Sequence, residues 1–195
     1  MTCIVGVVDG DHVLIGGDSL ESDAYASAEG DSYVLQRNDE KVFVLGEFVV
    51  GFCGSYRVGQ LIRYSFKPNS PKANDDNIMS YMVNEFINVL RTTMEQHGTL
   101  KTVEGEESFD AQLLVGWQNR LFVIGDDFNV GIMKDEWCAI GSGSQFALGS
   151  LHTTSELEDQ ISTDERIKHA LRAASMYSPW CKGPYTLVRT PINNE

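Results

Sequence analysis

The chain has 195 residues, and its 28 acidic and 15 basic side chains give a formal net charge of −13 at pH 7. This length is typical of one domain, so we expect a single domain over 1–195. With 42% hydrophobic and 22% charged residues, the composition favours a globular chain and excludes intrinsic disorder. A strong negative charge without clustered Lys and Arg argues against a nucleic-acid partner.

The cysteines and histidines are scattered along the chain, with no CxxC pair and no metal-ligand spacing. The sequence therefore predicts no metal and no cofactor, and we interpret the cysteines as reduced thiols of a cytoplasmic protein. No basic segment followed by an apolar stretch opens the chain, and no apolar run reaches the ~18 residues of a membrane span. We expect neither secretion nor membrane insertion.

The first third of the chain predicts two β-hairpins. Apolar runs at 2–8 and 12–15 flank an Asp-Gly-Asp turn, and runs at 41–45 and 48–53 flank a Gly-Glu turn. Both strands of the second hairpin are apolar enough for burial on two faces. The polar segment 19–38 between the hairpins indicates a loop or a weak strand.

Two neighbouring helices are expected next. The spacing of apolar residues changes toward the helical period of 3.6 residues at 55–66, which predicts a helix. The pattern over 77–97 predicts one long amphipathic helix. Its apolar positions are Met79, Met82, Val83, Phe86, Leu90 and Met94. The charged segment 99–108 that follows predicts a loop.

The remainder predicts strands followed by helices. We expect a hairpin over 111–117 and 121–124, an interrupted strand over 130–140, a short helix over 145–152, a helix starting at the Ser162 to Glu165 capping box, and a strand over 185–188. Strands grouped with strands and helices with helices indicate an α+β protein with two antiparallel sheets covered by helices.

Thr2, at the start of the first predicted strand, is a candidate nucleophile. Removal of Met1 would give Thr2 a free α-amine beside its own hydroxyl, and that amine can act as the general base. An α-amine has an ordinary pKa of about 7.7–8, so part of it is neutral at neutral pH. A nearby lysine ammonium would increase the neutral fraction.

The other parts of such a site occur at nearby strand ends. Lys41 is the only lysine in the first 66 residues, Asp18 ends the first hairpin, and Gly54 follows the second. Asp18 could hold the lysine in place, and a backbone N–H could stabilise an oxyanion. Each residue also has an ordinary interpretation, as a turn residue, a strand-edge solubiliser or a turn glycine, and only the joint pattern favours catalysis.

Three segments together resemble the proteasome β-type subunits and the smaller bacterial proteasome-related peptidases, which are N-terminal threonine hydrolases. They are TCIVGVVDGDHVLIGGDS at 2–19, KVFVLGEFVVGFCGS at 41–55 and AIGSGSQFALGSL at 139–151. The resemblance covers nearly the whole chain. It implies the four-layer αββα sandwich of the Ntn-hydrolase fold, two antiparallel sheets flanked by helices.

The resemblance also implies site roles. Thr2 becomes the nucleophile, Asp18 the carboxylate that orients Lys41, and Lys41 the residue that tunes the α-amine. Gly54 becomes the oxyanion donor and Ser142 a hydrogen-bonding partner of the amine, although Ser142 is equally interpretable as a helix N-cap. Finally, Phe52 and Cys53 would border the pocket for the substrate residue preceding the cut.

Two departures from the family pattern stand out. The segment between Asp18 and Lys41 is longer than in the family, so their contact requires 19–38 to bulge outward. The family also carries an aspartate and a serine after the penultimate helix, whereas 175–183 here has no aspartate and offers only Ser178.

The leading hypothesis is a threonine-type endopeptidase that assembles into a homo-oligomeric ring, cuts peptides or unfolded proteins, and is served by a separate ATPase. The first alternative is a catalytically inactive ring subunit that retains Met1. The second is an amidohydrolase that uses Cys3 as nucleophile. We expect the ring contacts at 55–66 and 77–97. Either these contacts overcome the repulsion between negatively charged subunits, or basic residues such as Arg57 and Arg63 offset it locally.

Overall fold

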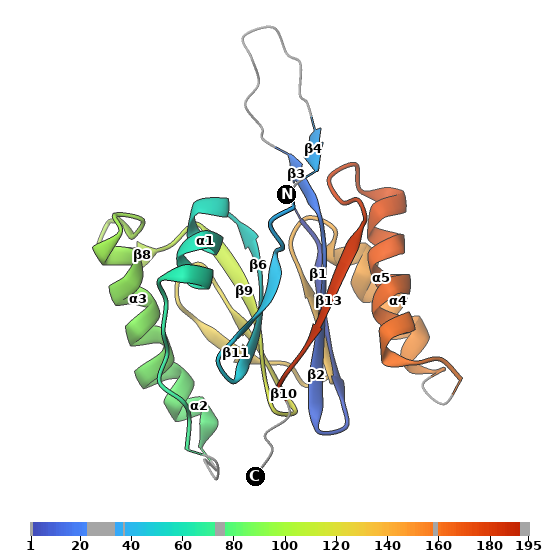
Figure 1. Ribbon diagram of the computed structural model, residues 1–195, viewed down its shortest axis with the longest axis horizontal. Coiled ribbons are helices and arrows are strands. Elements are labelled where there is room, and N and C mark those ends of the chain that lie inside the picture. Colours follow the sequence, from blue (N-terminus) through green and yellow to red (C-terminus); the bar gives the residue numbers. More distant parts are fainter. Residues whose placement is uncertain (1, 23–33, 37, 73–76, 158–159, 192–195) are drawn as a thin grey trace, which may run out of the picture.

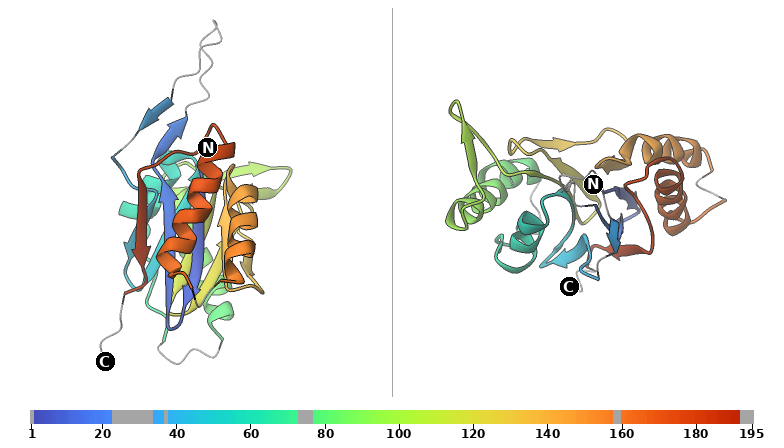
Figure 2. Two further views of the ribbon diagram at one scale, coloured as in Figure 1. Left: turned by 90° about the vertical axis from the view of Figure 1, so that its right-hand side faces the viewer. Right: turned by 90° about the horizontal axis from the view of Figure 1, so that it is seen from above.

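Two stacked β-sheets form the centre of the molecule, and helices cover both outer faces (Figure 1). The structure is a computed structural model that describes residues 2–22, 34–36, 38–72, 77–157 and 160–191. Seen from above, the order is helices, sheet, sheet, helices (Figure 2). The predicted α+β sandwich is therefore confirmed.

The first sheet carries the N-terminal hairpin. Its antiparallel order is β12 (Trp137–Ile140), β1 (Ile4–Asp9), β2 (His12–Asp18) and β13 (Tyr185–Arg189). The helices α4 (Ser144–Ser155) and α5 (Thr163–Tyr177) cover its outer face. The capping box at Ser162 and Glu165 starts α5 as predicted.

The second sheet is also antiparallel. Its order is β11 (Val130–Ile132), β10 (Arg120–Ile124), β9 (Ala111–Trp117), β6 (Phe48–Gly54) and β5 (Val42–Leu45). Helix α1 (Tyr56–Tyr64) and the continuous helix α2 (Ile78–Tyr81), η1 (Met82–Phe86) and α3 (Ile87–Gln96) cover its outer face, where η1 is a π-helical segment.

Side chains that alternate between the two faces of a strand contribute to two different apolar layers, one under the helices and one between the sheets. In β6, Phe48, Val50 and Phe52 pack with α1 and α3, whereas Val49 and Cys53 pack between the two sheets. Successive side chains of a strand point to opposite faces, so a strand between two layers must be apolar at every position. This confirms two-sided burial for β6, but β5 lies at the sheet edge and leaves Val44 exposed.

The prediction of a loop over 99–108 is wrong. This segment forms a hairpin of β7 (Lys101–Val103) and β8 (Glu106–Ser108). Glu104 and Gly105 both have positive φ, which suits a tight hairpin turn. The strands are largely exposed, so no alternation of apolar and polar residues marks them in the sequence.

Two further expectations need adjustment. Val83 was placed on the apolar face of 77–97 but is 45% exposed, because the buried face runs through Met82, Phe86, Leu90 and Met94. The segment 19–38 contains the paired strands β3 (Leu20–Ser22) and β4 (Val34–Gln36), which project beyond the sandwich, and 23–33 and 37 lie outside the described residues. No helix within the described ranges is both long and apolar enough to cross a membrane.

Candidate active site

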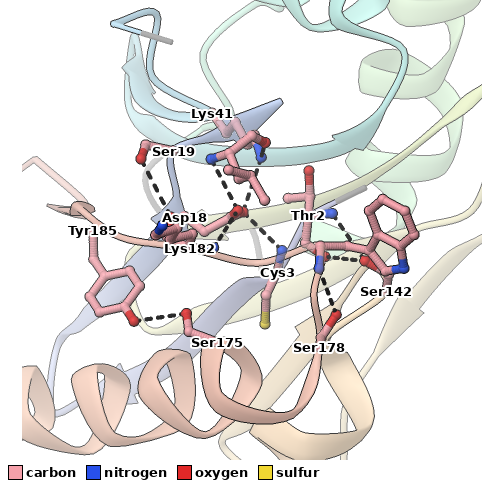
Figure 3. Close-up of polar contacts among 12 residues, drawn as sticks. Thr2, Cys3, Asp18, Ser19, Lys41, Ser142, Ser175, Ser178, Lys182 and Tyr185 are labelled. Carbon is pink, nitrogen blue, oxygen red and sulfur yellow. Dashed lines mark hydrogen bonds and ion pairs between the residues drawn. The ribbon is translucent and has the colours of Figure 1, made fainter. Parts of the chain in front are cut away.

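Asp18, the last residue of β2, is buried and accepts hydrogen bonds from several parts of the chain. Its Oδ1 accepts hydrogen bonds from the Cys3 backbone N–H at 3.0 Å and from Lys41 Nζ at 3.0 Å. Its Oδ2 accepts from the backbone N–H groups of Leu20 at 3.2 Å and Lys182 at 3.4 Å. This one carboxylate therefore links β1, β2, the start of β5 and the loop before β13 (Figure 3).

Lys41 is buried beside Asp18, with 1% of its side chain exposed. Besides the ion pair, its ammonium donates to the Leu20 carbonyl and lies 5.8 Å from the centre of the Tyr56 ring. Burial lowers the pKa of Lys41 below that of an ordinary lysine, and the Asp18 carboxylate opposes this effect. The contact with Asp18 exists because the longer intervening segment extends outward in β3 and β4.

Thr2 is held at the start of β1 by a turn after β12. Its backbone N–H donates to Ser142 Oγ at 3.2 Å, and its carbonyl accepts from the Ser142 hydroxyl at 3.3 Å and the Gly143 N–H at 3.3 Å. Ser142 therefore bonds to Thr2, and the interpretation of Ser142 as an N-cap is wrong. Gly143 occupies the cap position of α4, without a side-chain capping bond.

Two glycines with positive φ allow close backbone approaches, Gly141 to Thr2 and Gly54 to Asp110. Gly141 has φ of +92°, and a Cβ there would lie 2.3 Å from the Thr2 carbonyl oxygen. Gly54 has φ of +109°, and a Cβ there would lie 2.5 Å from the Asp110 carbonyl oxygen. L-residues with side chains rarely adopt such backbone angles, so both positions require glycine.

Phe52 and Cys53 point to opposite faces of their sheet. The Phe52 ring packs beneath α1 and lines a hollow of about 60 Å³ together with Asp39, Glu40 and Arg63. The Cys53 side chain lies between the sheets, where its thiol is 3.9 Å from Gln112 Oε1. Burial raises the pKa of Cys53 to about 11. Any pocket wall made by these residues therefore uses two different faces of β6.

Ser178, the one candidate that the sequence offers for the expected serine after the helix, directly follows α5. Its hydroxyl accepts from the Trp180 N–H at 3.4 Å (Figure 3). Its carbonyl accepts from the Cys181 N–H at 3.4 Å. Ser178 is buried, and these bonds shape the loop that presents Lys182 to Asp18.

Comparisons with solved structures identify the fold. The chain is similar to BPH from Thiobacillus denitrificans, with a TM-score of 0.75 and 18% identity over 100% of both chains. A second BPH structure, in complex with epoxomicin, also has a TM-score of 0.75 and 18% sequence identity, and the match covers 96% of this chain and 97% of that chain. Eukaryotic HslV from Trypanosoma brucei has a TM-score of 0.68 and 19% sequence identity. The match covers 96% of this chain and 98% of the HslV chain. No protein-family model matches the sequence. No curated protein matches it either.

The chain has the proteasome-like Ntn-hydrolase fold. Within this fold, the starts of β1 and β5 and the ends of β2 and β6 come together at one end of the sandwich (Figure 1). The side chains of Thr2, Asp18, Lys41 and Ser142 gather there (Figure 3). No cluster of three or more His, Cys, Asp or Glu side chains in the described part of the chain could hold a metal ion.

Several groups at this end of the Ntn-hydrolase sandwich were not predicted. The backbone N–H groups of Leu20, Lys182 and Gly143 and the carbonyl of Leu20 contribute hydrogen bonds. Every residue except proline has these backbone groups, so no residue type marks them in a sequence. Cys181 was also missed as a neighbour of Cys3, because 178 positions of sequence separate the two.

Proposed function

We propose that the protein is a threonine-type endopeptidase in which Thr2, after removal of Met1, is the nucleophile. The observation that carries this proposal is the double contact of Asp18 Oδ1, at 3.0 Å from both Lys41 Nζ and the Cys3 N–H. One carboxylate thereby fixes a buried ammonium and the backbone directly after Thr2. The fold shared with BPH and HslV supports the same conclusion.

In the proposed reaction, the Thr2 hydroxyl attacks a peptide carbonyl while the free α-amine accepts the hydroxyl proton. The positive charge of Lys41 disfavours protonation of that amine, and Asp18 keeps the ammonium charged and in place. The Gly54 N–H would stabilise the oxyanion. The amine then protonates the leaving amine, and water hydrolyses the ester that links the acyl group to Thr2.

Ser142 would keep the reacting amine oriented. Its hydroxyl lies 3.2 Å from the Thr2 nitrogen and also donates to the Thr2 carbonyl. Because Ser142 is exposed while Thr2 is only 3% exposed, substrate would approach from the Ser142 side. Phe52 and Cys53 are proposed to border the pocket for the residue before the cut.

Cys3 is a poor alternative nucleophile. Its side chain has no exposed surface, and contact with the Cys181 thiol together with burial raises the pKa of the Cys3 thiol. A thiol that resists ionisation is a weak nucleophile. The amidohydrolase hypothesis based on Cys3 is therefore disfavoured.

We also propose that one domain over 1–195 assembles into a homo-oligomeric ring that receives unfolded polypeptides from a separate ATPase in the cytoplasm. The apolar faces of α1 and α3 are largely buried against their own sheet, although Tyr64 and Val83 remain exposed on that layer. Exposed apolar residues also lie on the α4 and α5 layer, where Phe146 and Tyr177 have ring centres 5.7 Å apart and Met176 is 76% exposed. Light scattering of wild type and Tyr177→Glu tests this assembly.

Hydrolysis of fluorogenic peptides tests the peptidase itself. Wild type should lose Met1, as shown by intact mass, and should cut the peptides. Thr2→Ala should reduce turnover to the level of buffer, whereas Cys3→Ser should retain activity. A protein that keeps Met1 and cuts no peptide would support the alternative, an inactive ring subunit with Asp18 and Lys41 as structural residues.

A further inference from the structure

Cys3 and Cys181 form a buried dithiol directly behind the proposed nucleophile. Cys3 has no exposed surface and Cys181 is 3% exposed, and both belong to the apolar cluster between the first sheet and α4 and α5. Each thiol has the other as the largest influence on its pKa. The peptidase reaction proposed above uses neither sulfur.

Gly143 leaves the space between these two residues open. A Cβ at Gly143 would lie 2.6 Å from Cys181 Sγ and 3.0 Å from Cys3 Cβ. The Cys181 sulfur therefore cannot be further from Cys3 Cβ than these two distances combined. No side chain from Gly143 separates the two residues, and a displacement of Cys181 toward Cys3 would bring the sulfurs to the S–S bond length of about 2.0 Å.

The segment that carries Cys181 can supply this displacement. Cys181 lies between α5 and β13, in a stretch without helix or strand, and its N–H makes a long bond of 3.4 Å to the Ser178 carbonyl. The next residue, Lys182, donates its N–H to Asp18 and accepts from the Ser19 N–H. A shift of Cys181 toward Cys3 would therefore move a group that supports Asp18.

We propose that Cys3 and Cys181 form a reversible intrachain disulfide when the protein meets a peroxide. The Cys181 sulfur attacks one peroxide oxygen, the O–O bond breaks, and Cys181 becomes a sulfenic acid while the released hydroxide takes up a proton to form water. The Cys3 sulfur then displaces the sulfenic oxygen, which leaves as a second water. Two thiols are oxidised to one disulfide, and one hydrogen peroxide is reduced to two waters.

The order of these steps follows from the position and the electrostatics of the pair. Cys181 lies in the loop after α5 and keeps 3% exposure, whereas Cys3 has none, so peroxide reaches Cys181 first. Contact with Cys3 lowers the pKa of Cys181 to about 7, whereas contact with Cys181 and burial raise the pKa of Cys3. Cys181 is therefore the attacking thiol and Cys3 the resolving thiol, because the thiolate is the nucleophile.

Peptide mapping tests the proposal cleanly because each cysteine lies in a different tryptic peptide. Cys3, Cys53, Cys138 and Cys181 fall in 1–37, 42–57, 135–166 and 173–182. The native protein is treated with millimolar hydrogen peroxide, unfolded, alkylated at its free thiols and digested. We expect a linked pair of the peptides that contain Cys3 and Cys181, lighter than the two reduced peptides by two hydrogen atoms, and its loss on treatment with dithiothreitol.

Variants sharpen this experiment. Cys181→Ser should abolish the linked pair, and the matched control Cys138→Ser should retain it. Four alkylatable thiols after peroxide, a link that involves Cys53 or Cys138, or sulfinic acid on Cys181 without a link would each overturn the proposal. Because wild type alone gives this readout, the test stands even where a variant does not fold.

The consequence for activity rests on the proposed function. Oxidation should lower peptide hydrolysis by roughly tenfold or more, since displacing catalytic groups by about 1 Å has effects of that order. Dithiothreitol should restore it, and Cys181→Ser should keep its own untreated rate in peroxide. An untreated protein without hydrolysis would contradict the peptidase, whereas the linked peptides decide the disulfide independently.

Discussion

Lys41 Nζ lies 3.0 Å from Asp18 Oδ1, and both side chains are almost completely removed from solvent. A buried ion pair of this kind contributes mainly by satisfying two charges that would otherwise be buried alone. Here the same carboxylate also accepts three backbone N–H groups, so it organises the chain around Thr2 as well as neutralising Lys41.

Asp18→Asn should therefore destabilise the fold strongly. Removing one partner of a buried ion pair costs about 3–5 kcal/mol, because the other charge stays buried without its partner. The free energy of unfolding is measured in urea under reducing conditions. The matched control is Lys101→Ala, which removes an exposed ion pair with Asp110 and should change stability by less than about 1 kcal/mol. Equal effects of the two substitutions would contradict the role of Asp18.

Lys41→Met should slow peptide hydrolysis and change its pH dependence. A positive charge near the Thr2 amine lowers the pKa of that amine, so its removal raises this pKa. The acid limb of the kcat/KM profile should then move to higher pH, and turnover should fall about 10²–10⁴-fold. Lys101→Met serves as the control. An acid limb that stays in place would show that Lys41 does not act on the amine.

Gly141→Ala should disturb Thr2 far more than the same change at Gly46. Both glycines have positive φ, but a Cβ at Gly46 meets nothing within 4 Å, whereas one at Gly141 meets the Thr2 carbonyl oxygen. We expect about 1 kcal/mol of destabilisation at Gly46 and about 2–4 kcal/mol at Gly141, where strain and overlap combine. Urea unfolding of both variants measures this difference, and similar losses would argue against the close approach.

Stability should decline at alkaline pH through Cys53. Burial raises its pKa from 9.0 to about 11, so the folded state holds the thiol proton more tightly than the unfolded chain does. The protonated Cys53 thiol therefore stabilises the folded state fully below pH 9.0, and this stabilisation is lost as the pH rises to about 11. Cys53→Ser should reduce the slope of unfolding free energy in this window. Ser162→Ala, which costs about 1 kcal/mol through the helix cap, should keep the wild-type slope.

Local patterns were sufficient to predict most of the fold. Apolar runs and turn residues marked the hairpins of β1 with β2 and β5 with β6, and the capping box marked the start of α5. The hairpin at 101–108 was not predicted because its residues are largely exposed, and exposed strands show no alternation of apolar and polar residues in the sequence. The exposure of Val83 was not predicted, because the same apolar residues allow several orientations of the helix about its long axis.

The candidate site was predictable where it depends on residue type. Chemistry pointed to Thr2, Asp18 and Lys41, and the family resemblance added Ser142. The structure brings the four to one end of the sandwich. The contact of Lys41 with Asp18 could not be derived from spacing, because it depends on the projection of β3 and β4. The pairing of Cys3 with Cys181 depends on how α5 and its following loop pack on β1, which no local pattern encodes.

Covalent labelling of the nucleophile tests the central claim most directly. The native protein is incubated with a peptidyl β-lactone, which acylates an activated hydroxyl or thiol, and the modified residue is located in the N-terminal tryptic peptide by fragmentation. We predict an adduct on the Thr2 hydroxyl of a chain that has lost Met1, and no adduct on Thr2→Ala. An adduct on Cys3, or an unlabelled chain that retains Met1, would contradict the assignment of Thr2 as the nucleophile.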